Sequence, residues 1–160
     1  MAVDYALLGR QFLALAATER DRLALSANFV ALLHAELPDV NWLGLYVRRG
    51  DELVLGPFQG APACIRIPVG QGVCGTAAAR LRTLRVDDVH AFDGHIACDP
   101  ASNSELVVPL VSGGDVVAVL DIDSPTKARF SATDQAGVEA LCRQFVATLE
   151  SHGRPLQGFI

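Results

Sequence analysis

The sequence predicts a single α+β domain in which antiparallel strands lie between helices from the two ends of the chain. Apolar residues recur at helical spacing in both terminal segments, and two turn signals separate apolar runs in the middle. The length of 160 residues suits one domain whose core is large enough to fold without structural disulfides. We therefore expect residues 1–160 to form one unit.

The terminal segments supply the helices. Residues 4–37 predict two helices, because apolar side chains recur every three to four positions on either side of a break near Thr18 to Asp21. Pro38 ends the second helix, since its ring blocks further helical residues. At the other end, Ser131 can cap a last helix that has Asp134 in its first turn. The apolar stripe of that helix comprises Val138, Leu141, Cys142, Phe145, Val146 and Leu149.

Strand signals follow the N-terminal helices. The apolar runs 42–47 and 53–55 flank a turn at 49–51 and predict a β-hairpin. Residues 64–67 alternate apolar and polar side chains, which predicts a third strand.

The middle of the chain holds short elements and one long loop. Residues 73–81 are Ala-rich and predict a short helix that is entered through Gly70 and Gly72, and 84–86 predict a brief strand. Residues 87–103 have no periodicity and are about as long as structureless loops become in compact domains. Such loops are usually functional, so we expect the loop to belong to the active site.

Composition excludes several function classes. The net charge is −5, the pI is about 5.2, and no run of Lys or Arg is present, so neither nucleic acid nor an anionic membrane is an expected partner. The N-terminus lacks the pattern of a signal peptide, and no apolar run approaches the roughly 20 residues of a membrane span. A cytoplasmic location is expected, where cysteines are more often catalytic, metal-binding or buried than joined in structural disulfides.

Four cysteines differ in their surroundings. Cys142 lies on the apolar stripe and is expected in the core. Cys98 lies in the long loop, where a reactive role and an ordinary exposed thiol are both open. Cys64 begins a strand and could reach Cys98 only if the loop folds back. Cys74 begins a helix, whose dipole would lower the thiol pKa; alternatively, it packs beneath the glycine loop.

Neither a metal nor a cofactor is predicted. Three cysteines together with His90 and His95 could ligate zinc, but structural zinc sites usually pair cysteines two to four residues apart, and these gaps are far longer. The glycine loop at 70–75 vaguely resembles a dinucleotide loop but lacks a βαβ context. Mg²⁺ or Ca²⁺ bound by clustered carboxylates is a further alternative, which a neighbouring thiol makes less economical.

A carboxylate trio is predicted in a second hairpin, where the runs 105–111 and 116–122 flank a turn. Pairing places Glu105 roughly opposite Asp121 and Asp123, which share one face of their strand. Three neighbouring carboxyls repel one another, so we expect at least one raised pKa and a proton available for general acid catalysis. The cluster could equally bind an ammonium group, and the alternative is that both aspartates are solvated turn residues.

Two aromatic residues lie on the first strand. Trp42 and Tyr46 are four positions apart and therefore share a face. They could form a wall for a methyl or thioether group, or they could simply fill the core.

Four motifs together resemble the GAF-domain free methionine-(R)-sulfoxide reductases. They are Asn41-Trp42-Leu43-Gly44-Leu45-Tyr46, Gly56-Pro57-Phe58-Gln59-Gly60, Gly70-Gln71-Gly72-Val73-Cys74-Gly75 and Asp121-Ile122-Asp123-Ser124-Pro125. The resemblance covers nearly the whole chain. It implies a GAF-like fold with a central antiparallel sheet, terminal helices on one face and a long active-site loop on the other.

The resemblance also implies residue roles. Cys98 becomes the attacking thiol, Cys64 the resolving thiol and Cys74 an auxiliary third cysteine. The residues that match the substrate-binding and acid positions of the family are Trp42, Tyr46, Glu105, Asp121 and Asp123. No metal or other cofactor is implied.

The function implied is reduction of free L-methionine-(R)-S-oxide through a cysteine sulfenic acid and an intramolecular disulfide. Thioredoxin is the expected reductant, and a homodimer is compatible with the family. The rival hypothesis is a non-catalytic GAF module that senses a small molecule, as most GAF domains do. Counting thiols before and after adding the sulfoxide separates the two, because only a catalyst consumes them.

Overall fold

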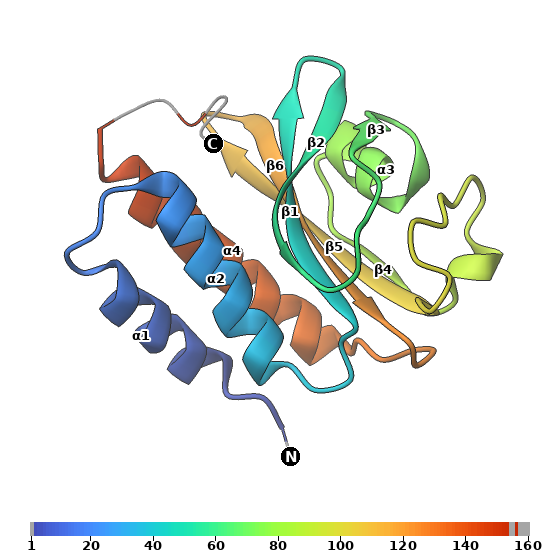
Figure 1. Cartoon of the computed structure of the whole chain (residues 1–160), viewed down its shortest axis with the longest axis horizontal. Helices are drawn as coiled ribbons and strands as arrows, with labels where there is room; N and C mark the ends of the chain where they lie inside the picture. The colour runs from blue at the N-terminus through green and yellow to red at the C-terminus, as the bar shows by residue number, and fades with distance from the viewer. Residues whose placement is uncertain (1, 154–155, 157–160) are drawn as a thin grey trace.

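The computed structural model of the chain describes residues 2–153 and residue 156. These residues form one antiparallel sheet with the strand order β3-β2-β1-β6-β5-β4 (Figure 1). The elements in chain order are α1 (Tyr5–Ala16), α2 (Arg22–Glu36), β1 (Trp42–Arg49), β2 (Glu52–Gln59), β3 (Arg66–Pro68), α3 (Gly72–Arg80), β4 (Leu84–Val86), the 3-10 helix η1 (Val89–Ala91), β5 (Ser104–Ser112), β6 (Asp115–Ser124) and α4 (Ala132–Glu150).

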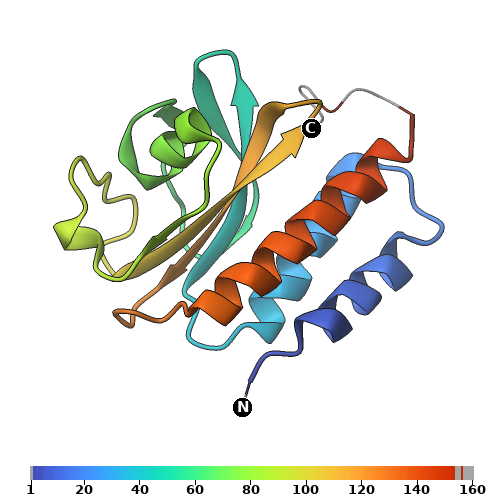
Figure 2. The same cartoon turned by 180° about the vertical axis from the view of Figure 1, so that it is seen from behind.

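The sheet separates two layers that differ in composition. The helices α2 and α4 cover one face and α1 lies outside them, whereas α3 covers the other face (Figures 1 and 2). Because alternate residues of a strand point to opposite faces, the central strands β1, β5 and β6 contribute side chains to both layers. The larger hydrophobic core lies on the face of α2 and α4.

Aromatic side chains fill the larger core. Phe29 of α2 stacks on Phe145 of α4 with ring centroids 4.3 Å apart, and Phe12 of α1 meets both rings edge to face. All three side chains are inaccessible to solvent. This packing fixes the terminal helices to one another and to one side of the sheet.

The helix ends follow the capping rules. The Asp4 carboxylate caps α1 by accepting from the Leu7 N–H at 2.8 Å. Ser131 caps α4, as predicted, and also forms a reciprocal capping box with Asp134. The Tyr5 hydroxyl donates to the same Asp134 carboxylate at 2.6 Å, which ties α1 to α4.

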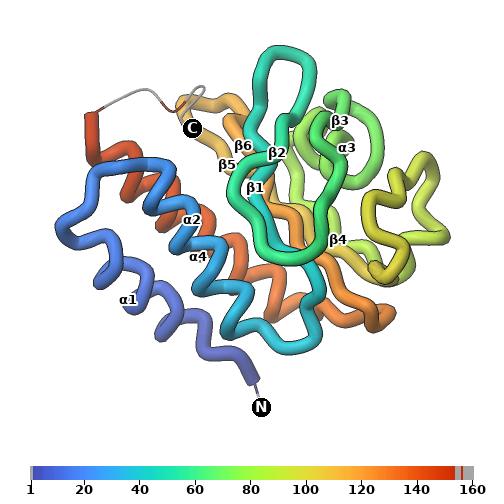
Figure 3. Tube along the Cα trace, in the orientation of Figure 1, coloured from blue at the N-terminus to red at the C-terminus, as the bar shows by residue number. Residues whose placement is uncertain are grey.

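The predicted elements are confirmed, with shifts at their ends. The predicted third strand begins two residues later, at Arg66, and Cys64 precedes it. The Cys64 carbonyl accepts from the Tyr46 hydroxyl at 2.8 Å, and the pairing of β3 with β2 starts only at Arg66. The short helix η1 interrupts the predicted loop, whose remainder lies beyond the edge of the sheet next to α3 (Figure 3).

The membrane prediction also has a structural counterpart. Within residues 2–153 and 156, no helix has both the length and the apolar character that crossing a bilayer requires.

Candidate active site

The central hairpin brings three carboxyl groups together on the face opposite the terminal helices. Glu105 of β5 pairs with Asp123 of β6, and Val107 pairs with Asp121. Since residues two apart on a strand share a face, all three carboxyls lie on the same side of the hairpin. Glu105 and Asp121 are each 6% exposed. The predicted meeting of the three residues is confirmed.

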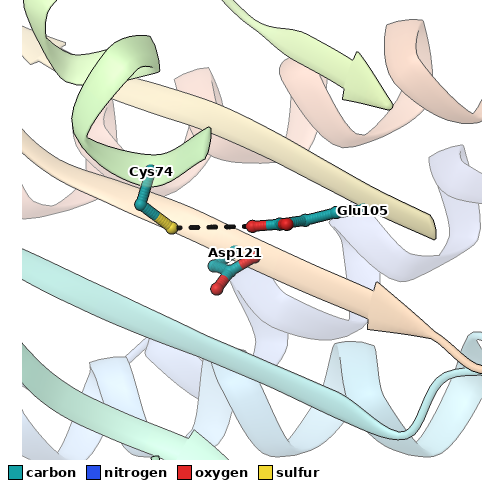
Figure 4. A group of neighbouring side chains, drawn as sticks. All are labelled: Cys74, Glu105 and Asp121. Carbon is teal, nitrogen blue, oxygen red and sulfur yellow. Dashed lines mark hydrogen bonds between the residues drawn. The ribbon is translucent and has the colours of Figure 1, made fainter. Parts of the chain in front are cut away.

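Cys74 completes the cluster from a different element. It lies in the first turn of α3, which crosses the hairpin so that the side chain points down onto the carboxyls (Figure 4). Its Sγ–H donates to Glu105 Oε1 at 3.8 Å. One donor atom each from Cys74, Glu105 and Asp121 lies within 4.8 Å of the others.

Burial determines the protonation of the carboxyls. Removal from water, followed by the charge of Asp121, raises the pKa of Glu105 well above its ordinary value, and burial does the same for Asp123. The pKa of Asp121 rises to about 6, because burial outweighs its hydrogen bonds to Glu105 and Cys74. The cluster therefore holds dissociable protons near neutral pH, as the sequence predicted for at least one of its members.

The pKa of the Cys74 thiol shifts in the opposite direction to the one that its helix position predicts. Burial, and then the neighbouring carboxylates Asp121 and Glu105, raise its pKa well above the ordinary value. The expectation that the helix dipole lowers this pKa is therefore wrong, because desolvation and nearby negative charge outweigh the dipole. The alternative interpretation, packing beneath the glycine loop, is confirmed by its 4% exposure. Cys142, on the helical face, is also buried, as predicted.

The long loop folds back so that Cys98 forms a disulfide with Cys64, with Cα atoms 5.4 Å apart. The two residues are 34 positions apart in the chain and are both half-buried. Cys98 lines the same small cavity as the carboxyl cluster, whereas Cys64 is not among the lining residues. The structure thus places an oxidisable thiol pair directly beside a buried acidic group.

The cavity at this site has a volume of about 30 Å³. It is lined by Tyr46, Ile67, Gly72, Val73, Cys74, His95, Ile96, Cys98, Asp99, Ser102, Glu105, Asp121 and Asp123. A larger groove of about 540 Å³ lies between β5 and α4 and includes none of the predicted site residues. Six of the eight predicted site residues therefore line the smaller cavity.

The two aromatic residues have different positions. Tyr46 lines the cavity, and Trp42 stacks behind it with ring centroids 5.8 Å apart. The Trp42 Nε1–H donates to the Ala61 carbonyl at 3.0 Å. Together with the bond from Tyr46 to Cys64, this contact anchors the segment that carries one half of the disulfide. The pair therefore shapes the site, with Tyr46 alone lining the cavity.

Sequence reasoning missed three polar residues of the loop as site members. His95 lies with its Nε2 3.8 Å from Glu105 Oε2, and burial lowers its pKa. Asp99 and Ser102 both accept from the Asn41 side chain, at 3.1 Å and 3.2 Å, which fixes the end of the loop to the start of β1. Their position in the stretch without periodicity, beside Cys98, was the available signal.

A backbone N–H group of the long loop has its hydrogen-bond partner within the loop. In the disulfide form the Cys98 N–H donates to the Ile96 carbonyl at 3.1 Å. The Ile96 side chain packs on Gly72, where an added Cβ would approach within 3.1 Å. The loop therefore closes over the start of α3.

Comparisons with known proteins agree with this geometry. A family model described as "GAF domain" matches residues 10–149. The free methionine-R-sulfoxide reductase of Escherichia coli is 57% identical over 146 residues, which cover 91% of this chain and 86% of that protein.

Solved structures give the same result. The free methionine-R-sulfoxide reductase of Neisseria meningitidis, in complex with its substrate, superposes with a TM-score of 0.89 at 41% identity and covers 95% of this chain and 94% of its own. The reduced form of fRMsr from Staphylococcus aureus superposes with a TM-score of 0.89 at 45% identity and covers 92% of this chain and 96% of its own.

Proposed function

The chain belongs to the GAF domain family, and on this basis we propose that it is a free methionine-R-sulfoxide reductase, an oxidoreductase that acts on sulfur. One observation supports the proposal above the others. The Cys64–Cys98 disulfide lies beside a cavity that is lined by the buried carboxyl groups of Glu105 and Asp121, the half-buried Asp123 and Cys98 itself. A reaction that oxidises one thiol next to a proton donor, and then joins it to a second thiol, leaves the protein in this state.

In the first step, the Cys98 thiolate attacks the sulfoxide sulfur. A protonated carboxyl of the Glu105, Asp121 and Asp123 cluster supplies a proton to the sulfoxide oxygen. The oxygen transfers to Cys98, which becomes a sulfenic acid, and methionine leaves with its sulfur reduced. The raised pKa values of the cluster keep a proton available for this step near neutral pH.

In the second step, the Cys64 thiol attacks the sulfenic acid. A disulfide forms and water leaves. An external dithiol then reduces the disulfide by exchange, becoming a disulfide itself, and restores both thiols. We propose thioredoxin as this dithiol and the cytoplasm as the compartment, where such reductants keep thiols reduced.

Charge supports a free amino acid as the substrate. Its ammonium group can bind the carboxylates that are not holding a proton, through charge-assisted hydrogen bonds. Tyr46 provides an apolar wall for the side chain, backed by Trp42. A methionine inside a protein chain has no ammonium group, so it lacks this contact.

Assembly is a further proposal. The same family membership is compatible with a homodimer, and we propose that exposed leucines of α1 and α2 contribute to its interface. Four leucines of these helices are between 43% and 55% exposed: Leu7, Leu13, Leu15 and Leu23.

Replacement of the attacking thiol tests the chemistry. Cys98→Ser should lower turnover of free methionine-R-sulfoxide by at least about 10³-fold, because serine is a far weaker nucleophile at neutral pH. Thiol counting during a single turnover of the unaltered protein should show two thiols consumed per methionine formed. The matched control is Cys142→Ala, which removes a buried thiol remote from the site. Retained multiple turnover by Cys98→Ser, or a sulfoxide reaction that consumes no thiol, would reject the proposal and favour a sensing module.

Replacement of the resolving thiol separates the two steps. Cys64→Ser should still form up to one methionine per chain, because the sulfenic acid needs only Cys98. Its recycling by thioredoxin should slow by about tenfold or more, since no intramolecular disulfide can form. Single-turnover and steady-state rates measured on the same preparation give this comparison. An equal loss in both assays would contradict the assigned division of labour.

A further inference from the structure

The donor set at the bottom of the site has the composition of a metal site as well as that of an acid catalyst. We propose that the protein, with its Cys64–Cys98 disulfide formed, binds one thiophilic divalent cation such as Zn²⁺ between Cys74 Sγ, Glu105 and Asp121. The cation would inhibit the enzyme, because it occupies carboxylates that the proposed function assigns to the substrate.

The spacing of the donor atoms suits a tetrahedral ion. Zn²⁺ lies about 2.3 Å from thiolate sulfur and about 2.0 Å from carboxylate oxygen, so a tetrahedral arrangement places the two donors about 3.5 Å apart. Cys74 Sγ and Glu105 Oε1 are 3.8 Å apart. One atom from each of Cys74, Glu105 and Asp121 lies within 4.8 Å of the others, so small side-chain rotations bring all three into range. The donors come from α3, β5 and β6 and converge on one point (Figure 4).

An unsatisfied atom within the cluster gives independent support. Asp121 Oδ1 is buried without a hydrogen-bond partner, although its side chain lines the cavity. A buried carboxylate oxygen without a partner is costly, so a ligand that supplies one is favoured. A cation in the cavity would supply it.

The size of the cavity selects an ion. Its volume of about 30 Å³ is enough for one water molecule or a small ion with its remaining water ligand. Pockets that bury organic ligands usually enclose roughly 300–1,000 Å³. The closed loop of the disulfide form therefore leaves room for a cation at a point where the amino acid substrate does not fit.

The donor types select among cations. The sulfur atom favours Zn²⁺ or Cd²⁺ over Mg²⁺ and Ca²⁺, which prefer oxygen ligands alone. On binding, the Cys74 thiol releases its proton to solvent and a sulfur–metal bond forms, with no change in oxidation state. His95 Nε2, 3.8 Å from Glu105 Oε2, is placed to orient that carboxylate or to join it as a ligand. Ligands on three separate elements show no short spacing in the sequence, which is why the spacing rule did not reveal them.

Cadmium provides a direct test, because Cd²⁺–thiolate bonds absorb in the ultraviolet whereas Cd²⁺ bound only to carboxylate or imidazole does not. The titration uses protein whose Cys64–Cys98 disulfide is intact, so that only Cys74 and Cys142 remain as thiols. We expect a thiolate absorption band that saturates at one Cd²⁺ per chain and is displaced by Zn²⁺. Sulfoxide is absent from the experiment, so its result does not depend on the proposed reductase activity.

Matched variants assign the site. Cys74→Ser should lose the absorption band, and Glu105→Gln and Asp121→Asn should each weaken Cd²⁺ binding by about tenfold or more. Cys142→Ala should bind as the unaltered protein does, and circular dichroism checks that each variant is folded. Absence of the band in the unaltered protein, its survival in Cys74→Ser, or its loss in Cys142→Ala would overturn the proposal. A chelator-reversible inhibition of turnover by Zn²⁺ would support its functional consequence.

Discussion

Asp121 illustrates how position changes the chemistry of a single residue. Near the end of an exposed strand it would be an ordinary ionised carboxylate, which was one interpretation of its sequence context. In the structure it is buried between Glu105 and Cys74, and its pKa rises to about 6. The sequence could predict that Asp121 lies near Glu105, because hairpin pairing is local. It could not predict the size of the pKa shift, because α3 and the long loop provide the burial.

Asp121→Asn should change how stability depends on pH. The pKa of Asp121 is raised in the folded state, so folding favours the protonated form. Below the unfolded pKa of about 3.8, the carboxyl is protonated in both states, and its ionisation does not change the stability. As the pH rises to about 6, the cost of ionising the buried carboxyl increasingly destabilises the folded state. The asparagine variant lacks this charge and should gain up to about 2–3 kcal/mol over the unaltered protein at pH 8. Urea unfolding at several pH values measures the difference.

Asp115→Asn is the matched control for Asp121→Asn. Asp115→Asn, at the exposed first position of β6, should leave the pH dependence of stability unchanged within about 0.5 kcal/mol. Sulfoxide turnover should fall in Asp121→Asn even where the variant is more stable. A difference in stability that does not vary between pH 4 and pH 8 would show that the charge of Asp121 is not the cause.

The element that links the site to the fold is the junction of α3 with the long loop. Gly72 begins α3 with φ +63°, and Ile96 of the loop packs against it. Ile96 lies two residues before Cys98 in the chain, and both Ile96 and Gly72 line the cavity. The sequence predicted both the helix entry through glycine and the loop, whereas their contact depends on chain segments that are far apart in the sequence.

Gly72→Ala should weaken the closure of the loop. The alanine Cβ would approach the Ile96 side chain to 3.1 Å, in addition to the strain of a left-handed backbone. We expect a loss of about 1–3 kcal/mol in stability and faster reduction of the Cys64–Cys98 disulfide by a small thiol. Denaturant unfolding and the rate of thiol release measure the two effects.

Gly70→Ala is the matched control for this variant. Gly70 also has a positive φ, +93°, but an added Cβ would meet no atom within 4 Å. It should lose stability through backbone strain without a matching rise in the rate of disulfide reduction. Equal acceleration of disulfide reduction in both variants would attribute the effect to strain at the glycines and remove Ile96 from the explanation.

At the scale of the whole molecule, the sheet separates the larger hydrophobic core from the candidate active site. The terminal helices and the aromatic trio of the larger core occupy one face, and the acidic cavity with its thiols occupies the other. Buried charge on the site face destabilises the protein, and the apolar packing on the helical face offsets it. Figures 1 and 2 show α2 and α4 on one side of the sheet and α3 on the other.

Phe29→Ala tests this separation. Phe29 is fully buried and stacks on Phe145, so its truncation should cost about 3–5 kcal/mol of stability. At temperatures where the variant remains folded, its turnover of sulfoxide should stay within about twofold of the unaltered protein, because Phe29 does not contact the cavity. Thermal unfolding and steady-state kinetics on one preparation measure both quantities.

The exposed Leu13 supplies the control, since Leu13→Ala should change stability by less than about 0.5 kcal/mol. A large loss of turnover by folded Phe29→Ala would show that the two faces are coupled.

The sequence by itself determined the elements and their order. Helical and strand periodicity, turn residues and the Ser131 cap are local signals, so they predicted the helices, the two hairpins and the position of Glu105 roughly opposite Asp121 and Asp123. The resemblance of its motifs to a known family supplied the expected pairing of Cys98 with Cys64, which the disulfide in the structure matches.

Only the tertiary structure decided the environment of each group. Cys74 was predicted to have a lowered pKa from its helix position, yet burial against two carboxylates raises it. His95 lies at the site because the folded loop places its Nε2 3.8 Å from Glu105 Oε2. Desolvation and the interaction of charges depend on distance in space and on exclusion of water, and neither quantity is fixed by neighbours along the chain.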